Sequence, residues 1–515
     1  MIEGYMERES VPVGRLLGFH VSTDAEEFRV RFYRLGKELS FVAESGPYPG
    51  VPAAPPPHPD GVPEHASPAV DWNWPPYQYV VPDDWRPGIY LAQFVEEQRD
   101  FEAQRDVDEQ RDVDEQRDVE RAEHRARSVP LLDDAHIEGF EREFFVVRPR
   151  RAGATGARIL YKKSTYTRHA YNRADRADVQ RAASLYDNPV HRPAGPDGPC
   201  GHRLSLHRPG GVIDLAYWDA PFIAWLERGG YLVEYCTDLD LHEDPGLLSS
   251  YRLLLSVGHD EYWSAAMRDH VADFVRGGGN VAFLSANTCW WRVHPVDANN
   301  AFVSDTDHHV GEEYPHLPAT DQWWPAPPDG VGEPENALTG VSFRNGGMWP
   351  GEWPGDRPRE GYRVQHADHW VYEGTGLRDG SDGGPADALG AGTPLIGYEC
   401  DGAAFARDAD GVAYATGVDG TPESFLILGI YLLDPVHEDF HHLKWGHWNC
   451  PVREAAITGP RAATMGLYTA GGTVFTAGTT DWPVVCGREL DAGVVRVTRN
   501  VLDRLSGAGP ATPER

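Results

Sequence analysis

The chain has 515 residues, of which 79 are acidic and 47 are lysine or arginine, so its formal net charge is -32 at pH 7. This length allows two or more domains with cores of their own, and so negative a charge disfavours binding to nucleic acid or to an anionic membrane. The six cysteines are scattered and lack zinc or redox spacings. Because no signal peptide or long apolar stretch is recognisable, we expect a cytoplasmic protein without membrane segments.

Residues 1–150 are predicted to form a first domain. Short apolar or alternating runs fill residues 11–95 between proline- and glycine-rich stretches, a pattern typical of a small antiparallel β-sandwich. A charged hexad repeat, QRDVDE, interrupts this pattern at residues 96–127. Its valines recur every six residues and form no helical stripe, which indicates a low-complexity insertion. The run FFVVRP at residues 144–149 then resumes the sandwich.

Residues 156–515 are predicted to form an α/β domain. The apolar runs ARILY, YLVEYCT, RLLLSV and NVAFLS alternate with the amphipathic stretches APFIAWLERGG and SAAMRDHVADFVRGGG. Such alternation predicts a doubly wound, mostly parallel sheet of the glutamine-amidotransferase-like or flavodoxin-like type. The runs GTVFTAG and VVRVTRNVLDRL near the end of the chain are expected to close the same sheet.

The sequence GHDEYW at residues 258–263 directly follows a buried-strand pattern. In open parallel sheets, the loops after the strand ends line the ligand crevice. The next strand delivers Asn287 to the same rim, so His259, Glu261 and Asn287 are expected to lie near one another. The loop after ARILY brings three phenols to this edge, namely Tyr166, Tyr171 and Tyr186. Helix capping, turn formation and packing over sheet ends are the competing structural explanations for these residues.

The run LLLSVGHDEYWSAAMRDHVADFVRGGGNVAFLSANTCWWRV resembles the C-terminal catalytic domain of the N,N-dimethylformamidase large (beta) subunit family. Further similarity lies in AYN, SLYD, HWVYEGTGL, LIGYECDG, GTVFTAGTTDW and TRNVLDRL, which together span about residues 156–505. This resemblance implies a metal-dependent hydrolase that cleaves the C–N bond of a small linear amide. It also implies a mononuclear ferric ion, Fe(III), that polarises the carbonyl group.

The resemblance assigns roles to individual side chains by motif. The implied metal ligands are Tyr171 in AYN, Tyr186 in SLYD and Glu261 in GHDEYW. Tyr166 lies close enough to Tyr171 that either could be the ligand in this loop. The same comparison places His259 and Asn287 beside the metal as substrate-orienting groups, and it makes Glu399 in GYECD the acid–base residue.

Substrate and assembly stay open at this stage. The resembling amidase subunit is considerably longer and works with a small partner subunit, so a homo-oligomer and an assembly with such a subunit are both compatible with this chain. The chain also carries a tryptophan-rich segment that we expect to shape a pocket of its own, with Trp290, Trp291, Trp323 and Trp324.

Two other functions compete with the amidase. The stretch HEDFH at residues 437–441 matches the H-E-x-x-H motif, and His447 has the spacing of a third zinc ligand. Pro435, Lys444 and Gly446 do not suit the helix that such a zinc protease needs. The third alternative is a non-catalytic scaffold protein, because a fold does not guarantee a function. Metal content separates these alternatives: iron, zinc or none.

Overall fold

The computed structural model describes most of the chain, namely residues 2–54, 56, 68–96, 142–172, 184–185, 191–192, 201–210, 214–306, 320–348, 357–381, 384–433 and 460–507. Three of the sequence predictions lie outside these residues. They are the charged repeat beyond residue 96, Tyr186, and the HEDFH stretch with His447.

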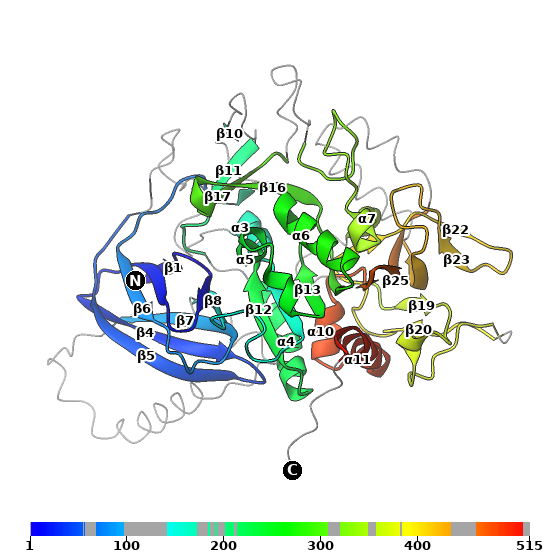
Figure 1. The fold of residues 1–515 in the computed structure, drawn as a ribbon, viewed down its shortest axis with the longest axis horizontal. Helices are drawn as coiled ribbons and strands as arrows, with labels where there is room; N and C mark the ends of the chain where they lie inside the picture. Colours follow the sequence, from blue (N-terminus) through cyan, green and yellow to red (C-terminus); the bar gives the residue numbers. More distant parts are fainter. Residues whose placement is uncertain are drawn as a thin grey trace, which may run out of the picture.

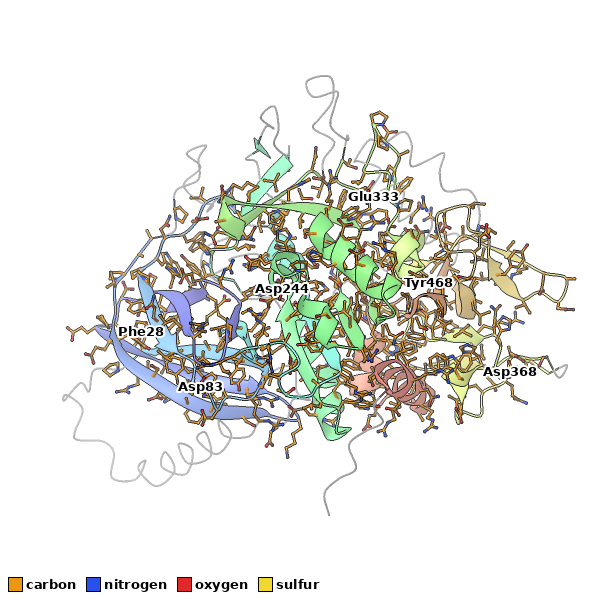
Figure 2. All side chains as sticks on the ribbon, viewed as in Figure 1. Phe28, Asp83, Asp244, Glu333, Asp368 and Tyr468 are labelled. Carbon is orange, nitrogen blue, oxygen red and sulfur yellow. The ribbon has the colours of Figure 1, made fainter. Side chains whose placement is uncertain are left out.

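The N-terminal part contains two β-sheets. One has the order β1 (Glu3–Met6), β3 (Leu16–Ser22), β6 (Pro76–Val80), and the other has the order β2 (Ser10–Pro12), β8 (Arg142–Arg148), β7 (Gly88–Glu96), β4 (Glu27–Leu35), β5 (Leu39–Pro49). Alternate residues of β4 are buried, and Phe28 and Val30 share one core with Phe19 of the other sheet. Figure 2 places Phe28 among these strands. These segments therefore form sheets, in agreement with the alternation of buried and more exposed residues along each strand.

A nine-stranded sheet forms the centre of the molecule (Figure 1). Its order is β12 (Val233–Thr237), β9 (Ile159–Lys163), β13 (Leu253–His259), β15 (Asn280–Ala286), β26 (Gly472–Thr476), β25 (Ala462–Ala470), β24 (Leu426–Leu432), β19 (Tyr362–Val364), β20 (Ala388–Leu389). Neighbours from β12 to β26 pair in parallel. Neighbours from β26 to β20 pair antiparallel. The sheet is thus mixed.

The prediction of a doubly wound, mostly parallel α/β fold is wrong. Half of the central sheet is antiparallel, and several further sheets make the protein β-rich. The antiparallel strands come from the glycine- and proline-rich region after Trp290, whose composition hides the period of two. Gly471, with φ +92°, supplies the tight turn of the β25–β26 hairpin. Hairpins of this kind replace the helical crossovers that a doubly wound sheet requires.

Helices cover both faces of the parallel half of the sheet. One face carries the π-helix η2 (Leu215–Asp219), α4 (Ala220–Arg228), α10 (Trp482–Gly487) and α11 (Ala492–Ser506), and the other carries α3 (Thr165–Tyr171), α5 (Asp238–Glu243) and α6 (Ala265–Arg276). Strand β13 is apolar on both sides. Leu253 and Leu255 belong to the hydrophobic core on the α4 side of the sheet, and Leu254 belongs to the core on the α6 side. Each fully buried leucine stabilises the fold by about 1.5–3 kcal/mol, which fixes the strand that ends at His259.

Smaller sheets and short helices complete the described part of the chain. One sheet has the order β10 (His191–Arg192), β11 (Gly201–Ser205), β17 (Ala301–Ser304), β16 (Trp291–Val296), β14 (Tyr262–Ser264). A second sheet pairs β18 (Ser342–Met348) with β21 (Glu399–Gly402), and a third pairs β22 (Phe405–Arg407) with β23 (Ala413–Ala415). The short helices are η3 (Leu247–Ser250), η4 (Asp297–Asn299), α7 (Asn336–Thr339) and η5 (Trp370–Tyr372). A bridge between Cys400 and Thr479 places β21 beside the residues that follow β26.

Ion pairs join the N-terminal sheets to helices α3 and α5. Arg168 of α3 pairs with Glu9 and, at 3.0 Å, with Glu143 of β8. Arg148, at the end of β8, lies 3.0 Å from Asp240 of α5. Because Arg168, Glu9 and Glu143 are nearly all removed from water, each charge depends on its partner. The N-terminal part of the chain therefore packs against α3 and supplies the acidic partners of Arg168.

Candidate active site at the end of strand β13

Four of the predicted site residues converge where β13 ends. Nε2 of His259 lies 2.8 Å from Oε2 of Glu399 and 3.2 Å from Oε2 of Glu261. The hydroxyl of Tyr171 donates a hydrogen bond of 2.6 Å to Oε2 of Glu261. Tyr171 comes from the last turn of α3, and Glu399 comes from β21. The site thus joins segments that are far apart in the sequence.

Gly258 allows the backbone turn that presents His259. Its φ is +76°, and a Cβ atom there would lie 2.8 Å from Cβ and Cγ of Trp218. Both facts require glycine, since other residues disfavour this φ and the space is filled. In the parallel register His259 pairs with Ala286, so Asn287 directly follows the neighbouring strand end. The predicted proximity of these two strand ends agrees with this register.

Asp401 holds the loop that carries Asn287. Asn287 has the left-handed φ of +49°, and its backbone N–H donates to Oδ1 of Asp401 at 2.8 Å. The N–H of Thr288 donates to Oδ2 at 3.2 Å. Burial raises the pKa of Asp401 to about 8 although these two hydrogen bonds lower it. The side-chain oxygen of Asn287 is buried and has no hydrogen-bond partner among the described residues.

Charges at the site compensate one another. Burial alone lowers the pKa of His259, but the carboxylates of Glu399 and Glu261 raise it to about 10. Burial raises the pKa of Glu261 in turn, against the lowering effect of His259. The imidazole is therefore cationic at neutral pH and lies between two acids.

Aromatic rings surround His259. Ring centroids of Tyr171, Trp218 and Tyr398 lie 5.2, 5.9 and 6.5 Å from that of His259. Nε1 of Trp218 donates to Asp481 at 3.1 Å, which fixes the indole. Trp218, Tyr398 and Asp401 are neighbours of the site that were not predicted from the sequence. Tyr398 and Asp401 flank Glu399 in GYECD and could have been found there, whereas Trp218 lies in a helix with no motif of its own.

The two candidate tyrosines of α3 have different surroundings. The Tyr171 hydroxyl contacts Glu261, whereas Tyr166 lines a separate cavity with about 40 Å³ of free space, together with His169 and Asp240. The Tyr166 hydroxyl is buried and has no hydrogen-bond partner in the described ranges. The structure thus brings Tyr171, and not Tyr166, to Glu261.

The tryptophans expected to shape a pocket pack within the protein. The guanidinium of Arg268 lies 4.6 Å from the ring centroid of Trp323, and that of Arg344 lies 4.6 Å from Trp324. Trp290 packs edge-on against Phe343 with ring centroids 5.5 Å apart. These contacts give the segment a structural role in cation–π and aromatic packing.

The oxygens of Tyr171 and Glu261 at the end of β13 fit a bound cation. They lie 2.6 Å apart, and phenol and carboxylate oxygens are ligands that a hard metal ion accepts. His259 is an ion-pair partner of Glu399 at 2.8 Å and not a metal ligand, because both nitrogens of its cationic ring carry protons. Within the described ranges, no three His, Cys, Asp or Glu side chains converge as a metal site. Among the described residues, a metal here would therefore need a donor of another type, such as the Tyr171 oxygen.

None of the helices in the described part of the chain combines the length and apolar character needed to cross a membrane.

Comparison with known proteins identifies a family model and two relatives that match this chain. A family model described as "N,N-dimethylformamidase beta subunit-like, C-terminal" matches residues 25–490. The N,N-dimethylformamidase beta subunit of Paracoccus aminophilus is 27% identical over 417 residues, which cover 72% of this chain and 51% of that protein. The N,N-dimethylformamidase beta subunit of Alcaligenes sp is 26% identical over 320 residues, or 57% and 38%.

The chain thus spans about half the length of the relatives it matches. The match begins inside the N-terminal sheets and continues through the central sheet to residue 490. It covers the segments that supply Tyr171, His259, Glu261 and Glu399, and the expected family is confirmed. This chain belongs to the N,N-dimethylformamidase beta subunit-like family.

Proposed function

We propose that this chain is a metal-dependent amidohydrolase that cleaves the C–N bond of a small amide. One observation carries the proposal: Tyr171, Glu261, His259 and Glu399 converge at the end of β13. The relatives in its family are named as N,N-dimethylformamidase subunits, which supports an amide as the substrate class.

Tyr171 and Glu261 would hold a mononuclear ferric ion, with Tyr186 as the third ligand expected from the resemblance. The contact between the Tyr171 hydroxyl and Glu261 supports this assignment because it brings two hard oxygens together. When bound, such an ion supplies Lewis-acid polarisation of the amide carbonyl.

The other side chains would manage protons and charge. Glu399 accepts a proton from the attacking water and delivers one to the leaving amine. His259, held cationic by its two acidic neighbours, and the side-chain amide of Asn287 stabilise the developing oxyanion. The rings of Trp218 and Tyr398 beside His259 limit the access of water.

We also propose that the chain works in an assembly. Both relatives are named as beta subunits, and this name supports an assembly with a second subunit, while a homo-oligomer stays the alternative. The native mass of the purified chain, alone and co-expressed with a candidate small subunit, distinguishes these two assemblies from a monomer.

Iron content and the visible spectrum of the purified chain test the metal assignment. We expect iron and a phenolate-to-iron charge-transfer band, both lost in Tyr171→Phe and Glu261→Gln. Tyr166→Phe is the matched control, since this tyrosine lies on the same helix but in the separate cavity, and it should keep the band. Tyr186→Phe tests the third ligand in the same way.

Glu399→Gln separates binding from turnover. This variant should keep the iron and the colour but lose hydrolysis of small amides, because its proposed role is proton transfer. Zinc in place of iron would support the HEDFH alternative, and a chain without metal would support the scaffold. Band retention in both Tyr171→Phe and Glu261→Gln would contradict the assigned ligands.

A further inference from the structure

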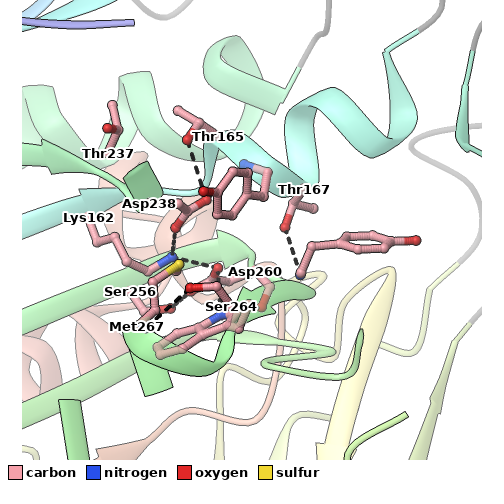
Figure 3. A network of polar contacts seen from close by, with 12 residues as sticks. Lys162, Thr165, Thr167, Thr237, Asp238, Ser256, Asp260, Ser264 and Met267 are labelled. Atoms are coloured by element: carbon pink, nitrogen blue, oxygen red, sulfur yellow. Dashed lines mark hydrogen bonds and ion pairs between the residues drawn. The ribbon is translucent and has the colours of Figure 1, made fainter. Parts of the chain in front are cut away.

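A buried ammonium group lies directly beneath the site. Lys162, near the end of β9, places Nζ 2.6 Å from Oδ1 of Asp238 and 2.7 Å from Oδ1 of Asp260. All three side chains are fully buried. Figure 3 shows Lys162 between the two carboxylates, which approach it from different elements. Because no water reaches these groups, each charge depends on the others.

Asp260 links the lysine to the residues on either side of it. It stands between His259 and Glu261, and its second carboxylate oxygen accepts a 2.5 Å hydrogen bond from Ser256. Its backbone oxygen accepts the N–H of Cys289 at 2.9 Å, so the loop after β15 is attached as well. These contacts connect Asp260 to Lys162, to strand β13 and to the loop after β15.

Asp238 links the same lysine to helix α3. Its Oδ2 accepts the backbone N–H of Tyr166 at 2.8 Å, in the first turn of the helix that ends at Tyr171. Helix α3 contacts the turn a second time, because Oγ1 of Thr167 accepts the N–H of Glu261 at 2.9 Å. One cation therefore joins the two elements that supply the Tyr171 and Glu261 oxygens.

We propose that Lys162 is a positioning residue that sets the geometry between Tyr171 and Glu261. It does so by holding α3 through Asp238 and the turn after β13 through Asp260. The importance of this geometry for metal binding rests on the proposed function, whereas the mechanical link itself does not.

Lys163 provides a matched control on the same strand. Its Nζ lies 2.5 Å from Asp214 and 2.9 Å from Asp219, and its side chain is only 3% exposed. Its acidic partners belong to η2 and the residue before it, on the opposite face of the sheet. Lys163→Met thus removes the same chemical group at the same depth without breaking the link between Asp238 and Asp260.

Hydrogen–deuterium exchange of the metal-free chain tests the link, followed by the visible band after iron is added. In Lys162→Met we expect amides of residues 165–172 and 260–263 to exchange about tenfold faster or more, and the band to be lost or shifted. Lys163→Met should accelerate exchange around η2 and leave both peptides and the band unchanged.

Asp238→Ala keeps the proposal testable if Lys162→Met does not fold. This variant leaves Lys162 paired with Asp260 alone, so residues 165–172 should exchange faster while residues 260–263 stay protected. Unchanged exchange of α3 in the folded Lys162 and Asp238 variants would overturn the proposal, as would an equal effect of Lys163→Met on both peptides. If the wild-type chain binds no iron, the proposed function fails, but the exchange experiment still decides the role of Lys162.

Discussion

Lys162 and Lys163 show how adjacent residues on one strand serve two regions of the molecule. Both ammonium groups are buried, and each contacts two carboxylates. The acids of Lys162 follow β12 and β13, the two strands that flank β9 in the sheet. Those of Lys163 belong to one helical segment, which carries Trp218. Both lysines form the same kind of ion pair. The elements that carry the acidic partners determine which part of the protein each lysine holds in place.

The largest expected effect comes from removing the aromatic ring on the Lys163 side. Trp218→Ala should lower the free energy of unfolding by about 3–5 kcal/mol, as large-to-small substitutions in cores do. Urea denaturation measures this loss. Exchange of α3 should stay slow, because α3 is held from the Lys162 side. Fast exchange of α3 in this variant would mean that the Lys162 side and the Lys163 side of the sheet are energetically coupled.

A smaller effect is expected where the two faces meet, at Gly258. Gly258→Ala combines a left-handed φ with a clash against Trp218, and it should cost about 1–3 kcal/mol. In Gly258→Ala/Trp218→Ala the contacts with the indole disappear and only the contact with Cβ remains, so the combined loss should be smaller than the sum of the single losses. A double-mutant cycle by urea denaturation measures this coupling. Strict additivity would contradict the contact.

A further expected effect is a pH dependence, and it concerns the Asn287 loop, which Asp401 holds. The pKa of Asp401 is raised from 3.8 to about 8, mainly by burial. Its contribution to stability is therefore complete below pH 4 and decreases as pH rises toward 8, because the unfolded chain loses this proton first. Asp401→Asn should flatten that part of the stability profile between pH 4 and 8. Identical profile shapes for wild type and variant would contradict the raised pKa.

The sequence predicts the β13–α6–β15 unit well because its signals are local. Ser264 caps α6 by accepting the N–H of Met267, and the helix ends before Gly277. The apolar runs on either side become neighbouring parallel strands. From that unit alone, the proximity of His259 to the strand end before Asn287 could be predicted.

The remainder of the fold depends on contacts between distant segments. Glu399 reaches His259 only because β21 pairs with β18 and lies beside the residues after β26. No local pattern encodes that arrangement, and the antiparallel half of the sheet was missed for the same reason. The two lysines of YKK were a readable signal, since successive strand residues face opposite sides and each buried charge requires a partner.

The ion pairs of Arg168 bear on how the protein can be shortened. Arg168 lies on α3, but its acidic partners, Glu9 and Glu143, come from the N-terminal sheets. A fragment that starts at residue 156 would keep Tyr171 but lose both acids, and it would expose to water the face of α3 that carries Arg168. The N-terminal 150 residues are therefore not a removable module, and any minimal version of this protein has to retain the sheets that support α3.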